Sequence, residues 1–85
     1  MMETSHANIW YNPDQYKYLI YSPKDGVTDI LEMYVGVWGD GKVYKSDTYQ
    51  TMEDLEQDAV HYNVVTTEGL RQTLLKAAKD FYDAD

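Results

Sequence analysis

The sequence has no cysteine and few basic residues. Lys and Arg number 7 against 15 Asp and Glu, so the net charge is −8 at pH 7. The absence of cysteine excludes disulfides and thiolate metal ligands. Because small secreted domains usually depend on disulfides, we expect an intracellular, cytoplasmic protein. A chain this acidic repels phosphate and anionic lipid, so we expect no direct binding to nucleic acid or membrane. Basic protein surfaces are attracted instead.

Long apolar runs are also absent. No stretch approaches the roughly 18 residues that a membrane span requires. The N-terminal segment MMETSHANIW has an acid where a secretory signal would be basic, and no apolar core follows it. A chain of 85 residues is enough for one small domain, which we assign to residues 1–85. Nine Tyr, two Trp and one Phe argue against disorder, because disordered chains are poor in aromatic residues.

Alternating apolar residues in the first half of the chain predict antiparallel strands. Residues 16–22 and 29–38 have the period of two that is typical of strands, and a turn containing Pro and Gly separates them. The Gly and Asp residues of 39–41 predict a short hairpin loop. Residues 42–49 would then return as a polar edge strand that two lysines protect from further pairing. Residues 8–11 are a candidate fourth strand.

The second half of the chain has the period of helices. Thr51 and Asp54 match the spacing of a capping box. The helix that follows is predicted to bury a stripe of Met52, Leu55, Ala59 and Tyr62. A second helix should begin at Thr66 or Thr67. Its apolar stripe consists of Leu70, Leu74, Ala77, Ala78 and Phe81. The chain is therefore predicted to be α+β, with an antiparallel meander of three to four strands followed by two helices packed on one face.

No motif for catalysis or for a bound cofactor stands out. Nucleophilic catalysis needs a nucleophile beside a base, and neither His6 nor His61 belongs to a recognisable motif of that kind. The segment WGDGKVYKSDTY lacks the ligand spacing of a calcium loop, and GDGK lacks the rest of a phosphate-binding loop. We therefore predict that the protein is not an enzyme and has no cofactor or metal.

The stretch between Lys45 and Arg71 contains six acids and no Lys or Arg. On a helical wheel its carboxylates cover the arc opposite the apolar stripe. Asp54 and Asp58 are like-charge neighbours four residues apart, which costs a few tenths of a kcal/mol. The helix dipole explains only the acids of the first turn. The stretch is either a solubilising face or a surface that binds a strongly basic partner by mimicking the charges of a nucleic acid.

Tyrosine is the second unusual feature of the composition. Tyr and Trp are enriched at binding hot spots, and nine Tyr are more than a small core easily buries. Ordinary packing between strands is the alternative explanation. The candidates for an exposed sheet surface are Tyr11, Tyr16, Tyr34, Tyr44 and Tyr49. The predicted protein-binding residues are Asp47, Glu53, Asp54, Glu56, Asp58, Tyr62, Tyr34 and Tyr49.

In composition the chain resembles small inhibitors, anti-CRISPR proteins among them, that phages and mobile elements use against host nucleic-acid machinery. The resemblance implies a non-enzymatic inhibitor whose acidic, nucleic-acid-mimicking surface blocks a basic nucleic-acid-binding protein. A second hypothesis is a small structural or accessory domain that homodimerises through a Tyr-rich sheet face near Tyr34 and Trp38. A third is an antitoxin or immunity protein that neutralises a basic nuclease.

Overall fold

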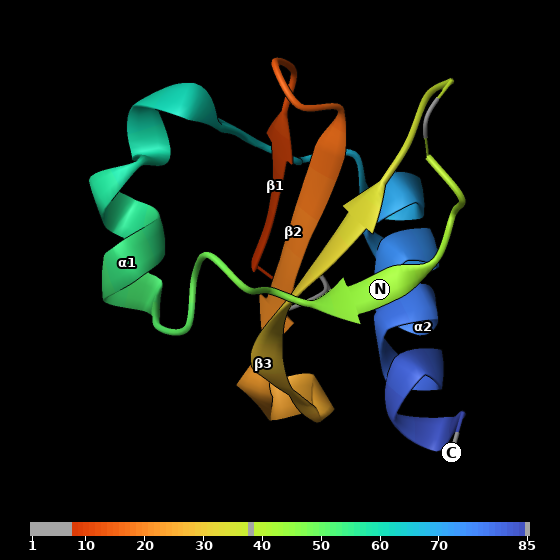
Figure 1. The fold of residues 1–85 in the computed structure, drawn as a ribbon. Helices are drawn as coiled ribbons and strands as arrows, with labels where there is room; N and C mark the ends of the chain where they lie inside the picture. Colours follow the sequence, from red (N-terminus) through yellow and green to blue (C-terminus); the bar gives the residue numbers. More distant parts are fainter. Residues whose placement is uncertain (1–7, 38, 85) are drawn as a thin grey trace.

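Five antiparallel strands form one sheet in the order β4-β3-β2-β1-β5 (Figure 1). The structure is a computed structural model that describes residues 8–37 and 39–84. The strands are β1 (Asn8–Asn12), β2 (Lys17–Ser22), β3 (Val27–Tyr34), β4 (Val43–Lys45) and β5 (Asn63–Val64). Strands β1 to β4 form the predicted meander, and β5 pairs with the outer side of β1. The α+β class is confirmed, and residues 8–11 do form a strand.

Two helices lie on opposite faces of the sheet (Figure 1). The helical elements are η1 (Pro23–Asp25), α1 (Met52–Gln57), the short 3-10 turn η2 (Ala59–His61) and α2 (Glu68–Asp83). Helix α2 begins after its N-cap Thr67, as predicted. It buries Leu74 and Leu75 against one face of the sheet. On the other face, Leu55 of α1 packs in a second core cluster together with Tyr62.

This arrangement corrects the prediction that both helices pack on one face. Successive side chains of a strand point to opposite faces of its sheet. In β2, Leu19 belongs to the core under α1 and Ile20 to the core under α2. In β3, Ile30 and Leu31 divide in the same way, and all four side chains are at most 3% exposed. Because both faces of the central strands are apolar, each face needs its own cover.

The loop between β3 and β4 is longer than the predicted hairpin turn of 39–41. Strand β3 ends at Tyr34 and β4 begins at Val43, so residues 35–42 connect them. The chain turns back so closely that a Cβ atom on Gly39 would lie 2.5 Å from the carbonyl oxygen of Tyr34. Only glycine fits there. Strand β4 is an edge strand, as predicted.

Helix α1 begins at the predicted capping box and ends earlier than predicted. The Thr51 side chain accepts a hydrogen bond from the backbone N of Asp54, and the Asp54 carboxylate accepts one from the backbone N of Thr51. The helix ends at Gln57, and η2 follows it. Ala59 is therefore exposed, whereas Tyr62 reaches the core from an extended backbone. No basic residue lies in the last turn of α1 to favour its continuation.

Candidate protein-binding surface

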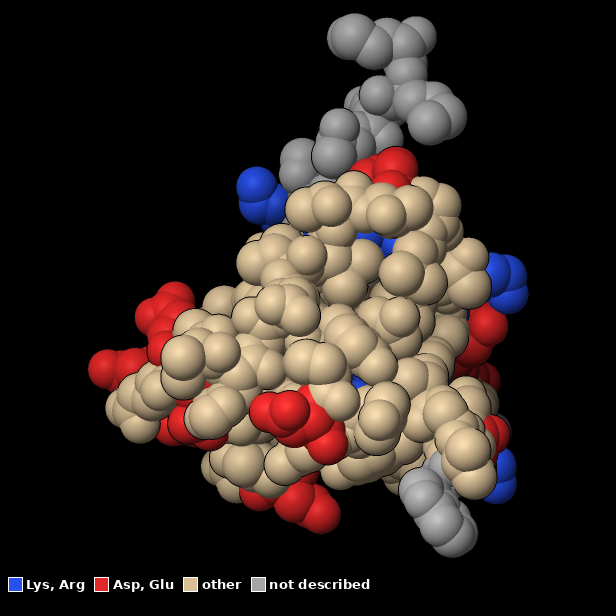
Figure 2. All heavy atoms as spheres, turned by 90° about the horizontal axis from the view of Figure 1, so that it is seen from above, with Lys and Arg blue, Asp and Glu red and all other residues tan. Residues whose placement is uncertain are grey.

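Acidic side chains on and beside α1 form a surface that no described Lys or Arg neutralises through an ion pair. We call Asp47, Glu53, Asp54, Glu56 and Asp58 the acidic surface. In the described part of the chain, no Lys or Arg forms an ion pair with any of these five residues. The Lys nearest to them in sequence, Lys45, pairs instead with Asp29 at 3.4 Å. Figure 2 shows acidic side chains gathered on the α1 side of the molecule, with no basic side chain among them in that view.

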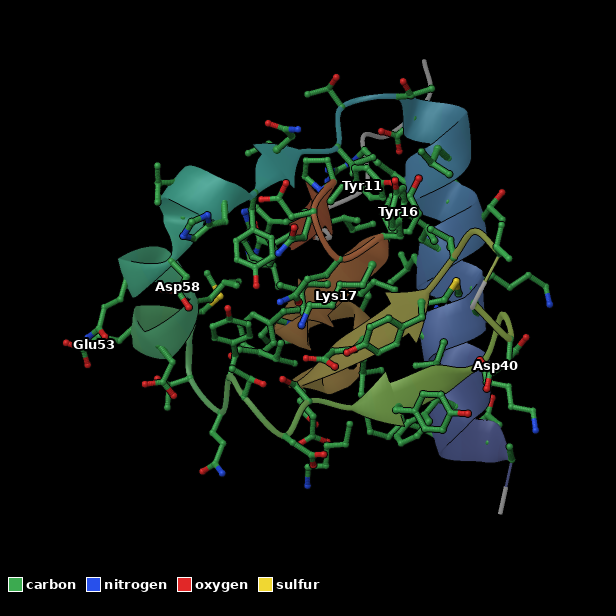
Figure 3. All side chains as sticks on the ribbon, turned by 45° about the horizontal axis from the view of Figure 1, so that its top comes forward. Tyr11, Tyr16, Lys17, Asp40, Glu53 and Asp58 are labelled. Carbon is green, nitrogen blue, oxygen red and sulfur yellow. The ribbon has the colours of Figure 1, made fainter. Side chains whose placement is uncertain are left out.

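Three of these acids are fully available to a partner. Asp47, Glu53 and Glu56 are exposed, and none of their carboxylates is used in a hydrogen bond within the described residues. Figure 3 shows Glu53 pointing away from the sheet. Glu53 lies in the first turn of α1, where the helix dipole favours an acid. Asp47 and Glu56 have no such role, so the fold alone does not explain their negative charge.

Asp54 has a structural role as well as a charge. Its Oδ2 atom accepts hydrogen bonds from the backbone N of Gln50 at 3.1 Å and of Thr51 at 3.2 Å. These bonds satisfy backbone donors that no helical carbonyl can reach. The carboxylate is consequently held in one position at the start of α1.

Asp58 is tied to two buried tyrosines. The Tyr49 hydroxyl donates to Oδ2 of Asp58 at 2.7 Å, and the Tyr62 hydroxyl donates to the Tyr49 oxygen at 2.5 Å. The two rings meet edge to face with their centroids 5.8 Å apart. Burial, reinforced by the hydrogen bonds to Tyr62 and Asp58, raises the pKa of the Tyr49 phenol well above its ordinary value. The phenol therefore remains a donor to Asp58 across the physiological range of pH.

Burial of Tyr49 and Tyr62 corrects their predicted place on a binding surface. They are 7% and 8% exposed, and both belong to the core under α1. They position Asp58 and cannot meet a partner as they stand. Of the sheet tyrosines expected at the surface, Tyr11 is half-buried against Tyr18. The exposed ones are Tyr16, Tyr34 and Tyr44. His6 and Trp38 lie outside the described residues.

A buried ion pair lies beneath this surface. Lys17 Nζ donates to Glu32 Oε2 at 3.2 Å, and the two side chains are only 4% and 9% exposed. Ser46 Oγ donates to the same carboxylate oxygen at 2.8 Å. The Lys17 nitrogen also lies 5.6 Å from the centre of the Tyr49 ring. Figure 3 shows Lys17 within the molecule, between α1 and the strands.

The ion pair also shapes the segment that leads into α1. Ser46, held by Glu32, accepts hydrogen bonds at its Oγ from the backbone N of Thr48 and of Tyr49. This turn exposes Asp47 and buries Tyr49, whose hydroxyl then holds Asp58. The same buried cluster therefore positions acids at both ends of the acidic surface.

Sequence reasoning missed the ion pair, although a signal for it was present. Lys17 alternates in phase with the buried Leu19, and Glu32 with the buried Ile30. Opposite charges at core-facing positions of neighbouring strands indicate a buried pair, because a single buried charge would be too costly.

The surface provides charge and hydrogen-bond acceptors. A cleft of about 530 Å³ borders it, with Asp29, Ile30, Lys45, Ser46, Asp47, Tyr49 and Gln50 as its lining.

Within residues 8–37 and 39–84, no three His, Asp or Glu side chains converge as they would around a metal ion. In the same part of the chain, no helix combines the length and apolarity needed to cross a bilayer.

Comparison with protein-family models, curated proteins and solved structures finds no match to the chain. Fold and surface together define an acidic α+β domain whose charged surface is positioned by buried tyrosines and a buried ion pair.

Proposed function

We propose that this protein is a non-enzymatic inhibitor that binds and blocks the basic surface of a nucleic-acid-handling protein. The observation that carries the proposal is the set of carboxylates around α1 that no described Lys or Arg neutralises. In the free protein these like charges repel one another. A cationic partner would relieve that repulsion, and association would be fast and sensitive to salt.

Rigid placement of part of the surface supports the same proposal. Asp54 is fixed by the start of α1, and Asp58 by the buried hydroxyl of Tyr49. A partner that binds these two carboxylates would lose little side-chain entropy in ordering them. The exposed side chains of Glu53 and Glu56, also on α1, extend the negative charge outward from the helix.

The experiment reverses two exposed charges that form no ion pair within the described residues. We expect the double variant Glu53→Lys, Glu56→Lys to bind an oligo-arginine peptide about tenfold more weakly than the parent, because exposed ion pairs contribute up to about 1 kcal/mol each. The matched control is Asp14→Lys, Asp83→Lys, which changes two exposed acids elsewhere by the same total charge. Calorimetry at low and high salt measures the affinity of each variant for the peptide. Equal losses in the two variants would show that only net charge matters, and the proposal would fail.

The target itself can be sought with the same variants. The parent protein, immobilised, should retain a basic nucleic-acid-binding protein from a host extract and release it at high salt, whereas the Glu53→Lys, Glu56→Lys variant should not. An antitoxin or immunity protein would use the same surface. The identity of the retained protein, a toxin nuclease or a defence or replication protein, separates these functions.

A further inference from the structure

An uncharged hollow lies between the β1–β2 turn and the loop that follows β3. Its volume is about 350 Å³, and its lining consists of Gln15, Tyr16, Tyr34, Val35, Gly36 and Val37. Three of these side chains leave much apolar surface in solvent: Tyr16 is 58% exposed, Tyr34 38% and Val37 92%. Small binding sites begin at about this volume. The hollow therefore has room for one large side chain.

Tyr16 is held in an unfavourable backbone conformation. Among the described residues it is the only non-glycine residue with a positive φ, at 52°. The turn that leads to Tyr16 is fixed by hydrogen bonds, because Asn12 Oδ1 accepts from the backbone N of Asp14 and of Gln15. The Tyr16 carbonyl accepts another from Val35 N at 2.8 Å. Glycine would occupy this position without strain, yet the chain has a large ring here that remains mostly exposed.

Contacts on the inner side of the hollow order the second ring. The Tyr34 hydroxyl donates to Glu32 Oε1 at 3.4 Å, and Lys17 Nζ lies 5.7 Å from the centre of the Tyr34 ring. Tyr16 lies beside Gly36, where an added Cβ atom would be 3.8 Å from the Tyr16 side chain. Rings held in this way lose little conformational entropy when they are covered.

We infer that the hollow receives an apolar side chain, aliphatic or aromatic, from the basic protein partner. A charged group would lose hydration against a lining that has no charge to compensate it. Lys17 already lies against the Tyr34 ring, which makes a second cation there less favourable. The inference depends on the proposed function only for the identity of the partner, since the preference for an apolar group follows from the lining.

A second copy of the chain is a poor occupant. Two molecules that each carry a charge of −8 repel one another. The exposed parts of Tyr16, Tyr34 and Val37 amount to on the order of 300 Å². A stable dimer buries about 800 Å² on each partner. An area of this size suits one anchoring side chain within a larger contact.

The experiment uses N-acetyl-leucinamide and N-acetyl-tryptophanamide as probes and follows the backbone amide signals of isotope-labelled protein by NMR. We expect the amides of Gly36 and Val37 to shift and saturate with both probes, and not with N-acetyl-argininamide. Tyr16→Gly should weaken binding about tenfold without loss of stability, because it removes the ring and the strain together. Val37→Ser should weaken binding as well, whereas Val60→Ser, which alters a valine that is 85% exposed on η2, should not.

Each other result overturns the inference. Stronger shifts with the arginine probe would identify a cation site, and an equal loss in Val60→Ser would indicate non-specific adsorption. A dimer in sedimentation that Val37→Ser disrupts would make a second copy the occupant. The Glu53→Lys, Glu56→Lys variant separates the two claims. It should bind the leucine probe normally while its binding of oligo-arginine is about tenfold weaker, so either interaction can fail without the other.

Discussion

At the scale of single residues, buried polar groups connect the core to the acidic surface. Within the described residues, every buried side-chain N or O atom has a hydrogen-bond partner. Lys17 pairs with Glu32, and the Glu32 carboxylate also accepts hydrogen bonds from the hydroxyls of Ser46 and Tyr34. Because a buried charge is tolerated only when it is paired, this cluster should be sensitive to loss of either partner.

Replacing one partner of the ion pair tests this sensitivity. We expect Lys17→Met to lower the free energy of unfolding by about 3–5 kcal/mol, since it leaves Glu32 buried with a charge and no cation. The double variant Lys17→Met, Glu32→Leu should recover most of that loss. Removing the exposed pair Lys76–Asp80 on α2 is the control and should cost less than about 1 kcal/mol. Urea unfolding measures all three, and equal effects of Lys17→Met and the control would contradict the assignment.

The Tyr49 hydroxyl should affect both stability and its dependence on pH. Tyr49→Phe removes the donor to Asp58, and we expect a loss of about 1–2 kcal/mol at neutral pH. The pKa of Tyr49 is raised in the folded protein from an ordinary value of 10.0. Its contribution is therefore complete below about pH 10 and declines at higher pH, where the unfolded chain releases the proton and the folded chain retains it.

The alkaline range isolates that contribution. Above about pH 10 the stability of the parent should fall more steeply with pH than that of Tyr49→Phe, because the variant has no proton to release at this position. Urea unfolding at a series of alkaline pH values compares the two slopes, and the other tyrosines cancel in the difference. Parallel slopes would mean that the phenol is not held protonated by the fold.

At the scale of elements, α1 is short and depends on its cap. Six residues are too few for a helix to persist by propensity alone. Leu55 supplies its only buried side chain, and the capping box supplies its first hydrogen bonds. The position of the acidic surface is therefore coupled to the start of this helix.

Two N-cap threonines allow a matched comparison. The Thr51 side chain accepts a hydrogen bond from Asp54 N, whereas Thr67, the N-cap of α2, makes no such bond. We expect Thr51→Ala to cost about 1 kcal/mol and Thr67→Ala only a few tenths. Thr51→Ala should also weaken binding of the oligo-arginine peptide, because Asp54 and its neighbours lose their fixed position. Denaturant unfolding and calorimetry measure the two effects. A larger cost for Thr67→Ala would show that the cap of α1 is unimportant.

At the scale of the whole molecule, the charge imbalance should make the free protein respond to salt. Mutual repulsion among unpaired acids destabilises the folded state, and salt screens it over about 10 Å at 0.1 M. We expect the melting temperature of the parent to rise with sodium chloride. The rise should be smaller for Glu53→Lys, Glu56→Lys than for Asp14→Lys, Asp83→Lys. Thermal scans at several salt concentrations provide the measurement. Equal rises in the two variants would mean that the repulsion comes from the whole surface and not from the acids of α1.

Local patterns account for what could be predicted from the sequence. Strand alternation, the capping box at Thr51 and Asp54, and the opening of α2 at Thr67 each depend on residues within a few positions of one another. The acid-rich stretch without Lys or Arg was likewise visible. The apolar stripe extended to Tyr62 misplaced the end of α1, because Tyr62 reaches the core from an extended backbone after η2 rather than from a helix.

By itself the sequence determined the secondary structure near its caps, the α+β class and the excess of negative charge, because periodicity and composition are local properties. Tertiary structure alone decided which face each helix covers. Leu19 and Ile20 point to opposite faces and are equally apolar, so the sequence does not indicate which helix covers which face. It also decided that Tyr49 and Tyr62 are buried, that Lys17 pairs with Glu32 and that no Lys or Arg in the described part of the chain pairs with the acids of α1. Those outcomes depend on contacts between residues far apart in the chain, which no short window of sequence contains.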